Sequence, residues 1–136
     1  MNDTYKIIQP TEQGLPLTHS FSDGIYAREI FMPKGSLIIG HVHNTTHLNI
    51  VSTGSALVSI DGEIQRITAP YTFESESGCR KILYIEEDMF WTTIHKTDDR
   101  DLDSLTHTLI DLDASKDLDS KKILNSFKKE IKCLGL

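Results

Sequence analysis

The sequence of 136 residues is short of several features that define other classes of protein. Its two cysteines, Cys79 and Cys133, stand far apart, which argues against a disulfide scaffold or a zinc ribbon and favours a reducing, cytoplasmic compartment. The longest apolar run, residues 36–40, is far too short to span a bilayer, and the N-terminus is too polar for a signal peptide. With 14 basic against 20 acidic residues, no basic face for nucleic acid is expected. We therefore expect a cytoplasmic protein that binds neither membranes nor nucleic acid.

The chain has the length of a single domain, long enough to bury a hydrophobic core. Residues 1–96 carry the pattern of an all-β domain. Short β-type runs alternate with turn residues about every 8–12 positions, which is typical of a sandwich or a small barrel. Asp61-Gly62 is a strong signal for a two-residue hairpin. The acidic triplet at 86–88 indicates a second hairpin turn. The expected strands cover residues 25–32, 37–43, 48–53, 56–60, 64–67, 80–85 and 90–95.

Residues 97–136 read as a C-terminal helical extension. Apolar residues recur at helical spacing from 102 to 110 and again from 123 to 134, so two helices are predicted. Thr97 or Asp98 is available as the N-cap of the first helix. We expect this extension to pack on the β-domain or on the partner subunit of a homodimer.

Three of the histidines, His41, His43 and His47, lie close together in the sequence. In a strand, residues i and i+2 project from one face, so His41 and His43 would form a chelating pair. A tight turn would return His47 opposite His43, and neutral imidazoles suit Zn, Fe, Ni or Cu better than Mg or Ca. The alternative is three polar residues on a solvated hairpin. Two further histidines are not expected to bind the metal: His19, in a stretch typical of a loop, and His107, within the first predicted helix.

This stretch resembles the first sequence motif of the cupin superfamily. The motif runs glycine, five residues, His-x-His, three or four residues, glutamate, six residues and glycine. Four residues stand at the matching places: Gly35, His41, His43 and Gly54. His47 takes the glutamate position, where it would remain a metal ligand. The resemblance covers roughly residues 25–95 and implies an RmlC-like cupin jelly-roll barrel, here all-β with two α-helices after it.

The second cupin motif normally supplies another histidine, and this sequence departs from it. Arg80 or Lys81 stands where that histidine is expected. If Ile85 and Phe90 flank a hairpin loop, the two flanking strands pair in a defined register. In that register His95 lies opposite Arg80 and faces the interior as a fourth metal ligand. A slip of one residue would turn His95 outward, as a surface histidine at a strand end.

Further residues share the inferred interior faces with the histidines. Arg80 or Lys81 inside the barrel would bind an anionic group such as a carboxylate or a phosphate. The alternative is a cation on an exposed sheet edge. The other candidates for substrate binding are Asn49, Tyr84 and Trp91.

The segment from 26 to 97 also resembles small cupin-like proteins of tailed phages, which combine an HxH hairpin with APxTF and EDxxWxTxH segments. This resemblance implies a phage protein in the host cytoplasm and supplies no substrate.

We expect a divalent transition metal such as Zn, Fe or Ni, and an enzyme of the oxygenase, isomerase or lyase type acting on a small polar or anionic molecule. The alternatives are a non-catalytic phage cupin that binds a ligand or a host protein, and a structural phage protein. Fold-level likeness alone does not choose among them.

Overall fold

A computed structural model describes residues 6–8, 15–111 and 120–135 of the chain. The strands are β1 (Lys6–Ile8), β2 (Leu17–Ser22), β3 (Ile25–Met32), β4 (Ser36–Ile39), β5 (His47–Ile60), β6 (Glu63–Thr68), β7 (Tyr71–Ser75) and β8 (Lys81–Lys96). The helices are α1 (Leu102–Leu109) and α3 (Ser120–Cys133). In this part of the chain, neither helix has the length and apolar character needed to cross a membrane.

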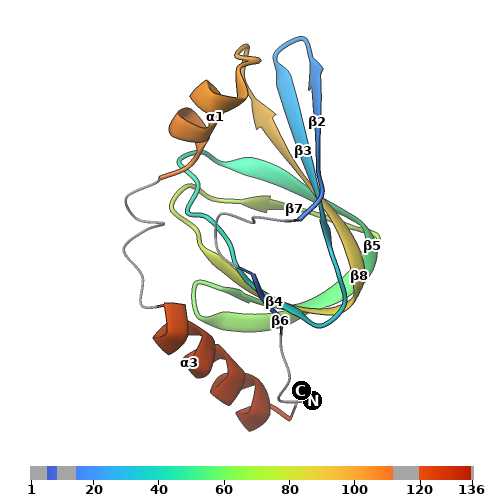
Figure 1. The fold of residues 1–136 in the computed structure, drawn as a ribbon, viewed down its shortest axis with the longest axis vertical. Helices are drawn as coiled ribbons and strands as arrows, with labels where there is room; N and C mark the ends of the chain where they lie inside the picture. The colour runs from blue at the N-terminus through green and yellow to red at the C-terminus, as the bar shows by residue number, and fades with distance from the viewer. Residues whose placement is uncertain (1–5, 9–14, 112–119, 136) are drawn as a thin grey trace.

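The two longest strands, β5 and β8, organise the sheet. The first half of β8 pairs with β4 and its second half pairs with β3, while β5 runs antiparallel along the other side of β8. β5 pairs in turn with β6 and β7, and β2 extends the sheet beyond β3. The strands curve into a barrel, with α1 near the β2–β3 end and α3 beside β4 and β6 (Figure 1). The predicted β-barrel with two C-terminal helices is confirmed.

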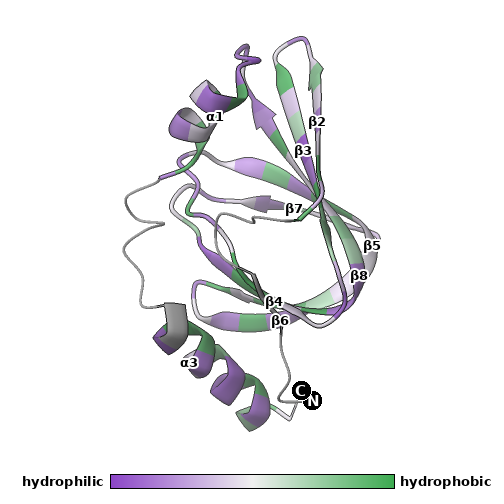
Figure 2. Cartoon of the chain, viewed as in Figure 1, coloured by the Kyte–Doolittle hydropathy of each residue, from purple (hydrophilic) through white to green (hydrophobic). Residues whose placement is uncertain are grey.

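Side-chain alternation along β8 separates the interior of the barrel from its outer face. Leu83, Ile85 and Trp91 belong to the buried cluster inside the barrel. Ile82 and Tyr84 point the other way and join a second cluster beneath α3. Hydrophilic and hydrophobic residues both colour α3 (Figure 2), and the apolar ones that this second cluster contains are Ile123, Leu124, Phe127 and Ile131.

Replacing Phe127 with alanine tests whether α3 stabilises the barrel of its own chain. Phe127 is 2% exposed and packs in the cluster with Leu37, Ile39 and Leu57. We expect Phe127→Ala to lower the free energy of unfolding by about 3–5 kcal/mol, because it removes a buried ring and leaves a cavity. Urea denaturation measures the loss, with the exposed neighbour Ser126→Ala as control. Equal stability of the two variants would contradict the packing.

The hairpin predicted at Asp61-Gly62 is confirmed. Ile60 pairs with Glu63 across the β5–β6 turn. Asp61 and Gly62 have φ angles of 50° and 85°, which is the backbone that a type I′ turn requires.

The second predicted hairpin, at residues 86–88, is wrong. β8 runs without interruption through the acidic triplet, and its register with β5 shifts there, between Val51 and Ala56 of β5. The triplet is stabilised in the strand by partners from distant parts of the chain rather than by a turn. Arg66 donates to both carboxylate oxygens of Glu86 at 2.8 and 3.1 Å, and the Lys34 backbone N–H donates to Asp88 at 2.8 Å.

Other boundaries also differ from the predicted ones. The runs 48–53 and 56–60 belong to one strand, β5, which continues through Gly54, and β4 ends at Ile39 instead of reaching residue 43. The stretch around His19, expected to be a loop, is strand β2. The N-cap of α1 is Asp101, whose carboxylate accepts from the Asp103 and Ser104 N–H groups, and not Thr97 or Asp98. Local propensity missed the strand boundaries because pairing with distant strands sets them, whereas the N-cap is a local feature that depends on which acidic side chain reaches the first N–H groups of the helix.

Candidate metal and ligand site

The loop between β4 and β5 carries His41 and His43, and it is held by backbone contacts from other parts of the chain. His43 forms an isolated antiparallel bridge with Ile110, just after α1. On either side of it, Asn44 N–H donates to the Leu109 carbonyl and Asp111 N–H donates to the Val42 carbonyl, both at 2.8 Å. The prediction that His41 and His43 form a pair on one regular strand is therefore wrong, because β4 ends at Ile39. The segment after α1 positions His43 instead.

Three imidazoles meet inside the mouth of the barrel, and we call His43, His47 and His95 the histidine cluster. The ring centroids of His43 and His47 lie 4.5 Å apart, those of His47 and His95 4.8 Å, and those of His43 and His95 5.8 Å. His47 comes from the first residue of β5 and His95 from the end of β8. The rings of this cluster thus come from three separate segments of the sequence.

His95 reaches the cluster by a route that differs from the predicted one. β8 does not fold back on itself, so His95 does not pair with Arg80. It pairs with Tyr26 of β3, and its neighbour Ile94 pairs with Leu48 of β5. Leu48 and Ile94 share one face of the sheet because they are paired. Their neighbours His47 and His95 therefore share the opposite face, which is the interior one.

Each ring of the cluster keeps one buried nitrogen without a hydrogen-bond partner among the described residues. These atoms are His43 Nδ1, His47 Nε2 and His95 Nδ1. His47 Nδ1 lies 3.0 Å from the Thr45 carbonyl oxygen, which can only accept, so Nδ1 carries the proton and Nε2 carries the lone pair. Buried polar atoms of this kind are costly unless a ligand satisfies them.

The environment of the cluster keeps the three imidazoles neutral. Burial, together with the neighbouring His47 and Lys81, lowers the pKa of His43 to about 2. Burial also lowers the pKa of His95 to about 4, with His47 and Arg28 as additional causes, and it lowers the pKa of His47. The neutral form is the one that binds transition metals.

These shifts predict that the metal-free protein loses stability on mild acidification. The folded state holds His43 and His95 neutral, whereas the unfolded chain protonates them below a pKa of about 6.5. The unfolded state then binds more protons, so the free energy of unfolding falls by about 1.4 kcal/mol per group for each pH unit below that value. Urea denaturation in EDTA at pH 7.5 and 5.5 measures the loss, and the exposed-site variant His107→Gln should retain it. Constant stability between the two pH values would contradict neutral burial.

The histidine cluster has the donor chemistry of a metal site without its finished arrangement. Within the described ranges, no group of three or more His, Cys, Asp or Glu side chains is placed so that it could hold a metal ion. The chemistry nevertheless fits, because three neutral, buried imidazoles each offer a ring nitrogen that lacks a partner.

Two cavities adjoin the cluster. The inner cavity, about 60 Å³ in volume, lies within the barrel and is lined by residues that include His47, Asn49, Lys81 and Trp91. The outer chamber, about 330 Å³, lies between α1 and the β2–β3 hairpin, and its lining includes His95. His41 and His43 line both cavities. His41, the predicted ligand that is not part of the histidine cluster, thus lies where the two cavities meet.

Asn49 and Trp91 form a buried polar network beside the cluster. Trp91 Nε1–H donates to Asn49 Oδ1 at 3.0 Å, and the Asn49 amide donates to Ser75 Oγ at 2.7 Å. Asn49 is 1% exposed and Trp91 is 4% exposed. Both predicted residues therefore lie in the interior, where they also support β5 and β7.

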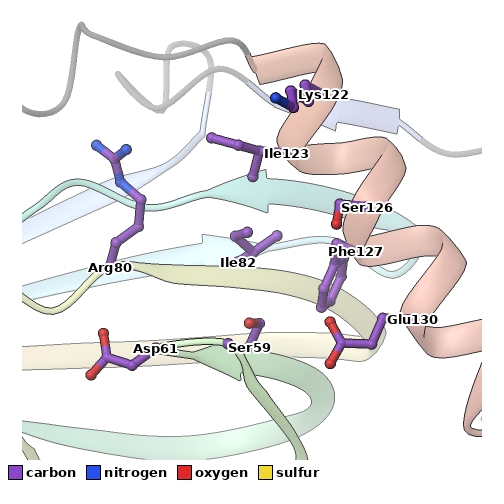
Figure 3. Close-up of a pocket in the computed structure, with 10 residues that line it drawn as sticks. Ser59, Asp61, Arg80, Ile82, Lys122, Ile123, Ser126, Phe127 and Glu130 are labelled. Carbon is purple, nitrogen blue, oxygen red and sulfur yellow. The ribbon is translucent and has the colours of Figure 1, made fainter.

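The structure separates the other predicted ligand-binding residues. Lys81 is buried and faces the inner cavity, so of the two predicted alternatives, Arg80 or Lys81, Lys81 is the cation inside the barrel. Arg80 and Tyr84 lie on the outer face, and the interior position inferred for Tyr84 is wrong. Figure 3 shows Arg80 beside Ile82, opposite Ile123 of α3, around an external cavity of about 560 Å³. The reason is parity: odd-numbered β8 residues from Lys81 to Ile85 point inward and even-numbered ones point outward.

The sequence analysis missed Arg28, which lines both cavities. Arg28 lies within β3 and pairs with Thr93 of β8 and His19 of β2. The alternation within the correctly predicted strand 25–32 was the available signal. It places Arg28 on the same face as Tyr26 and Ile30, which are buried.

Comparison with known proteins identifies the fold. Neither family models nor curated proteins give a match, but solved cupin structures do. A cupin 2 domain-containing protein from Halorhodospira halophila superposes with a TM-score of 0.55 at 17% identity, over 71% of this chain and 77% of that one. An RmlC-like cupin family protein with a double-stranded β-helix fold from Methanocaldococcus jannaschii gives a TM-score of 0.53 at 10% identity, over 72% and 93%.

A third structure, the DMSP lyase DddQ from Ruegeria pomeroyi, gives a TM-score of 0.53 at 17% identity over 64% of this chain. The match spans about half of that lyase, 49% of its chain. Identities this low show the fold alone. The chain has the cupin jelly-roll fold, which confirms the predicted fold class. The phage origin, the homodimer and the cytoplasmic location stay predictions.

Proposed function

We propose that this chain is a metal-binding cupin protein that acts as an enzyme on a small polar or anionic molecule. The observation that carries the proposal is the histidine cluster, with three buried ring nitrogens that have no hydrogen-bond partner in the described part of the chain. His43, His47 and His95 would hold a divalent transition metal such as Zn, Fe or Ni, and His41 at the junction of the cavities is the candidate for a fourth ligand. The bound metal would supply Lewis-acid or oxygen-activating chemistry.

The residues around the cluster have separate roles in this proposal. Thr45 fixes the tautomer of His47 through its carbonyl, as the outer partners of metal-binding histidines commonly do. Lys81 supplies a cation to the inner cavity and would orient an anionic group of the substrate. The apolar residues of the barrel interior exclude water from the far side of the cluster. This donor set is compatible with oxygenase, isomerase and lyase chemistry.

Metal analysis of the purified full chain tests the proposal. After loading with zinc and gel filtration, we expect about one metal ion per chain in the wild type and in His107→Ala, which removes an exposed histidine. The double variant His43→Ala/His47→Ala should retain almost none, because it removes two of the three ring nitrogens of the histidine cluster. Circular dichroism verifies that the variants are folded. Equal, negligible metal in the wild type and the double variant would overturn the proposal.

The zinc affinities of single variants show how much each of the four predicted ligands contributes. Loss of His95 should lower zinc affinity much more than loss of His41, because the ring of His95 lies 4.8 Å from that of His47 within the cluster. A metabolite screen that follows consumption then separates an enzyme from a binding protein. Stabilisation by a molecule that the metal-loaded protein does not consume would favour the non-catalytic alternative.

A further inference from the structure

The outer chamber and the inner cavity join at three residues. Arg28, His41 and His43 line both spaces. A molecule that occupies the chamber therefore reaches the histidine cluster at its deep end. The volume of about 330 Å³ is at the small end of ligand sites, which span about 300–1,000 Å³. The chamber suits a small metabolite.

The deep end of the chamber carries a cationic side chain. Arg28 is half-buried there, and a guanidinium is the group that recognises a carboxylate through paired N–H donors. Asp103, the other fully charged residue among the described lining residues, lies in the exposed first turn of α1. A bound anion would be repelled by Asp103 and attracted by Arg28, so its charged end points toward the histidine cluster.

The other walls of the chamber are apolar. Leu105 and Leu109 of α1 are buried and line it. Leu17 and Leu102 also line it, yet they are 38% and 42% exposed. Exposed leucines from β2 and from α1 around one cavity provide a surface that an aliphatic portion of a ligand would cover.

We propose that the outer chamber binds a small carboxylate with an aliphatic portion, its carboxylate at Arg28 and its aliphatic portion against the leucines of α1 and β2. This inference rests on the proposed function for the chemistry at the histidine cluster, and it makes Arg28 the residue that determines substrate charge. Helix α1 has a double role: its chamber-facing side shapes the ligand site, and the segment after it positions His43.

The test is calorimetric titration of the EDTA-treated full chain with hexanoate and with its neutral isostere hexanamide. We expect hexanoate to bind about 10- to 100-fold more tightly than the amide, the difference that a charge-assisted hydrogen bond makes. Arg28→Gln should abolish this preference. Arg80→Gln is the matched control, because Arg80 lies on the outer face beside α3, and it should keep the preference. Equal binding of acid and amide by the wild type, or equal effects of the two arginine variants, would overturn the assignment.

A second pair of variants locates the aliphatic portion without touching Arg28. Thr106 lines the chamber from α1, so Thr106→Trp fills part of it and should weaken hexanoate binding at least tenfold. Thr108→Trp, on an exposed position of the same helix, should leave binding unchanged. Undiminished binding by Thr106→Trp would overturn the assignment. Because these titrations contain no metal, their failure is distinguishable from failure of the metal analysis, which bears on the proposed function alone.

Discussion

Gly54→Ala unfolds the protein or lowers its free energy of unfolding by about 2–6 kcal/mol, the sum of the cost of backbone strain and the cost of overpacking. Gly54 lies within β5 at φ 90°, a conformation that side chains with a Cβ rarely adopt. A Cβ at this position would lie 2.8 Å from Met89 Cα and 2.9 Å from the Asp88 carbonyl carbon. These are backbone atoms of β8, so neither can rotate away.

Gly62→Ala is the matched control for this prediction. Gly62 has nearly the same φ, 85°, but a Cβ there meets no heavy atom within 4 Å. It should cost only the strain of the backbone, about 1–3 kcal/mol. Urea denaturation compares the two variants. If Gly54→Ala were as stable as Gly62→Ala, the close approach of β5 and β8 would be wrong.

Asn49→Ala should lower the free energy of unfolding by about 3 kcal/mol, since it leaves two buried groups unsatisfied at about 1–3 kcal/mol each. The groups are the indole N–H of Trp91 and the hydroxyl of Ser75. Both groups belong to buried residues.

Urea denaturation measures the cost, and the emission of Trp91, the single tryptophan, reports the local change. Asn125→Ala removes the same side chain from an exposed position of α3 and should change stability by less than about 0.5 kcal/mol. A similarly small effect of Asn49→Ala would show that the network does not hold β5 against β8 and β7.

The closing glycine of the cupin-like motif illustrates what a local pattern conveys. The sequence places Gly54 at a fixed distance from His47 and suggests a strand end. In the structure the strand continues, and the glycine is required because β8 crosses it closely. The residue was identified correctly, but its physical role depends on a strand that lies more than thirty positions away in the sequence.

The acidic triplet at 86–88 shows the opposite case. Three consecutive acids are unfavourable in an isolated strand and typical of a turn. Long-range partners reverse this preference: Arg66 engages Glu86 and Lys34 engages Asp88. An interior position was one of the two predicted for His95, and the structure places His95 there through the pairing of β8 with β3 and β5 rather than through the predicted pairing with Arg80.

The sequence by itself determined the β-rich class, the Asp61-Gly62 hairpin, the two C-terminal helices and the group of histidines, because these follow from periodicity and from local turn and helix preferences. Only the tertiary structure decided which faces became the interior. Closure of the barrel turned Lys81 inward and Arg80 outward, brought Arg28 to the junction of the two cavities and joined His95 to His43 and His47. A strand pattern of period two specifies which residues share a face, but the pairing of distant strands specifies which face encloses the site.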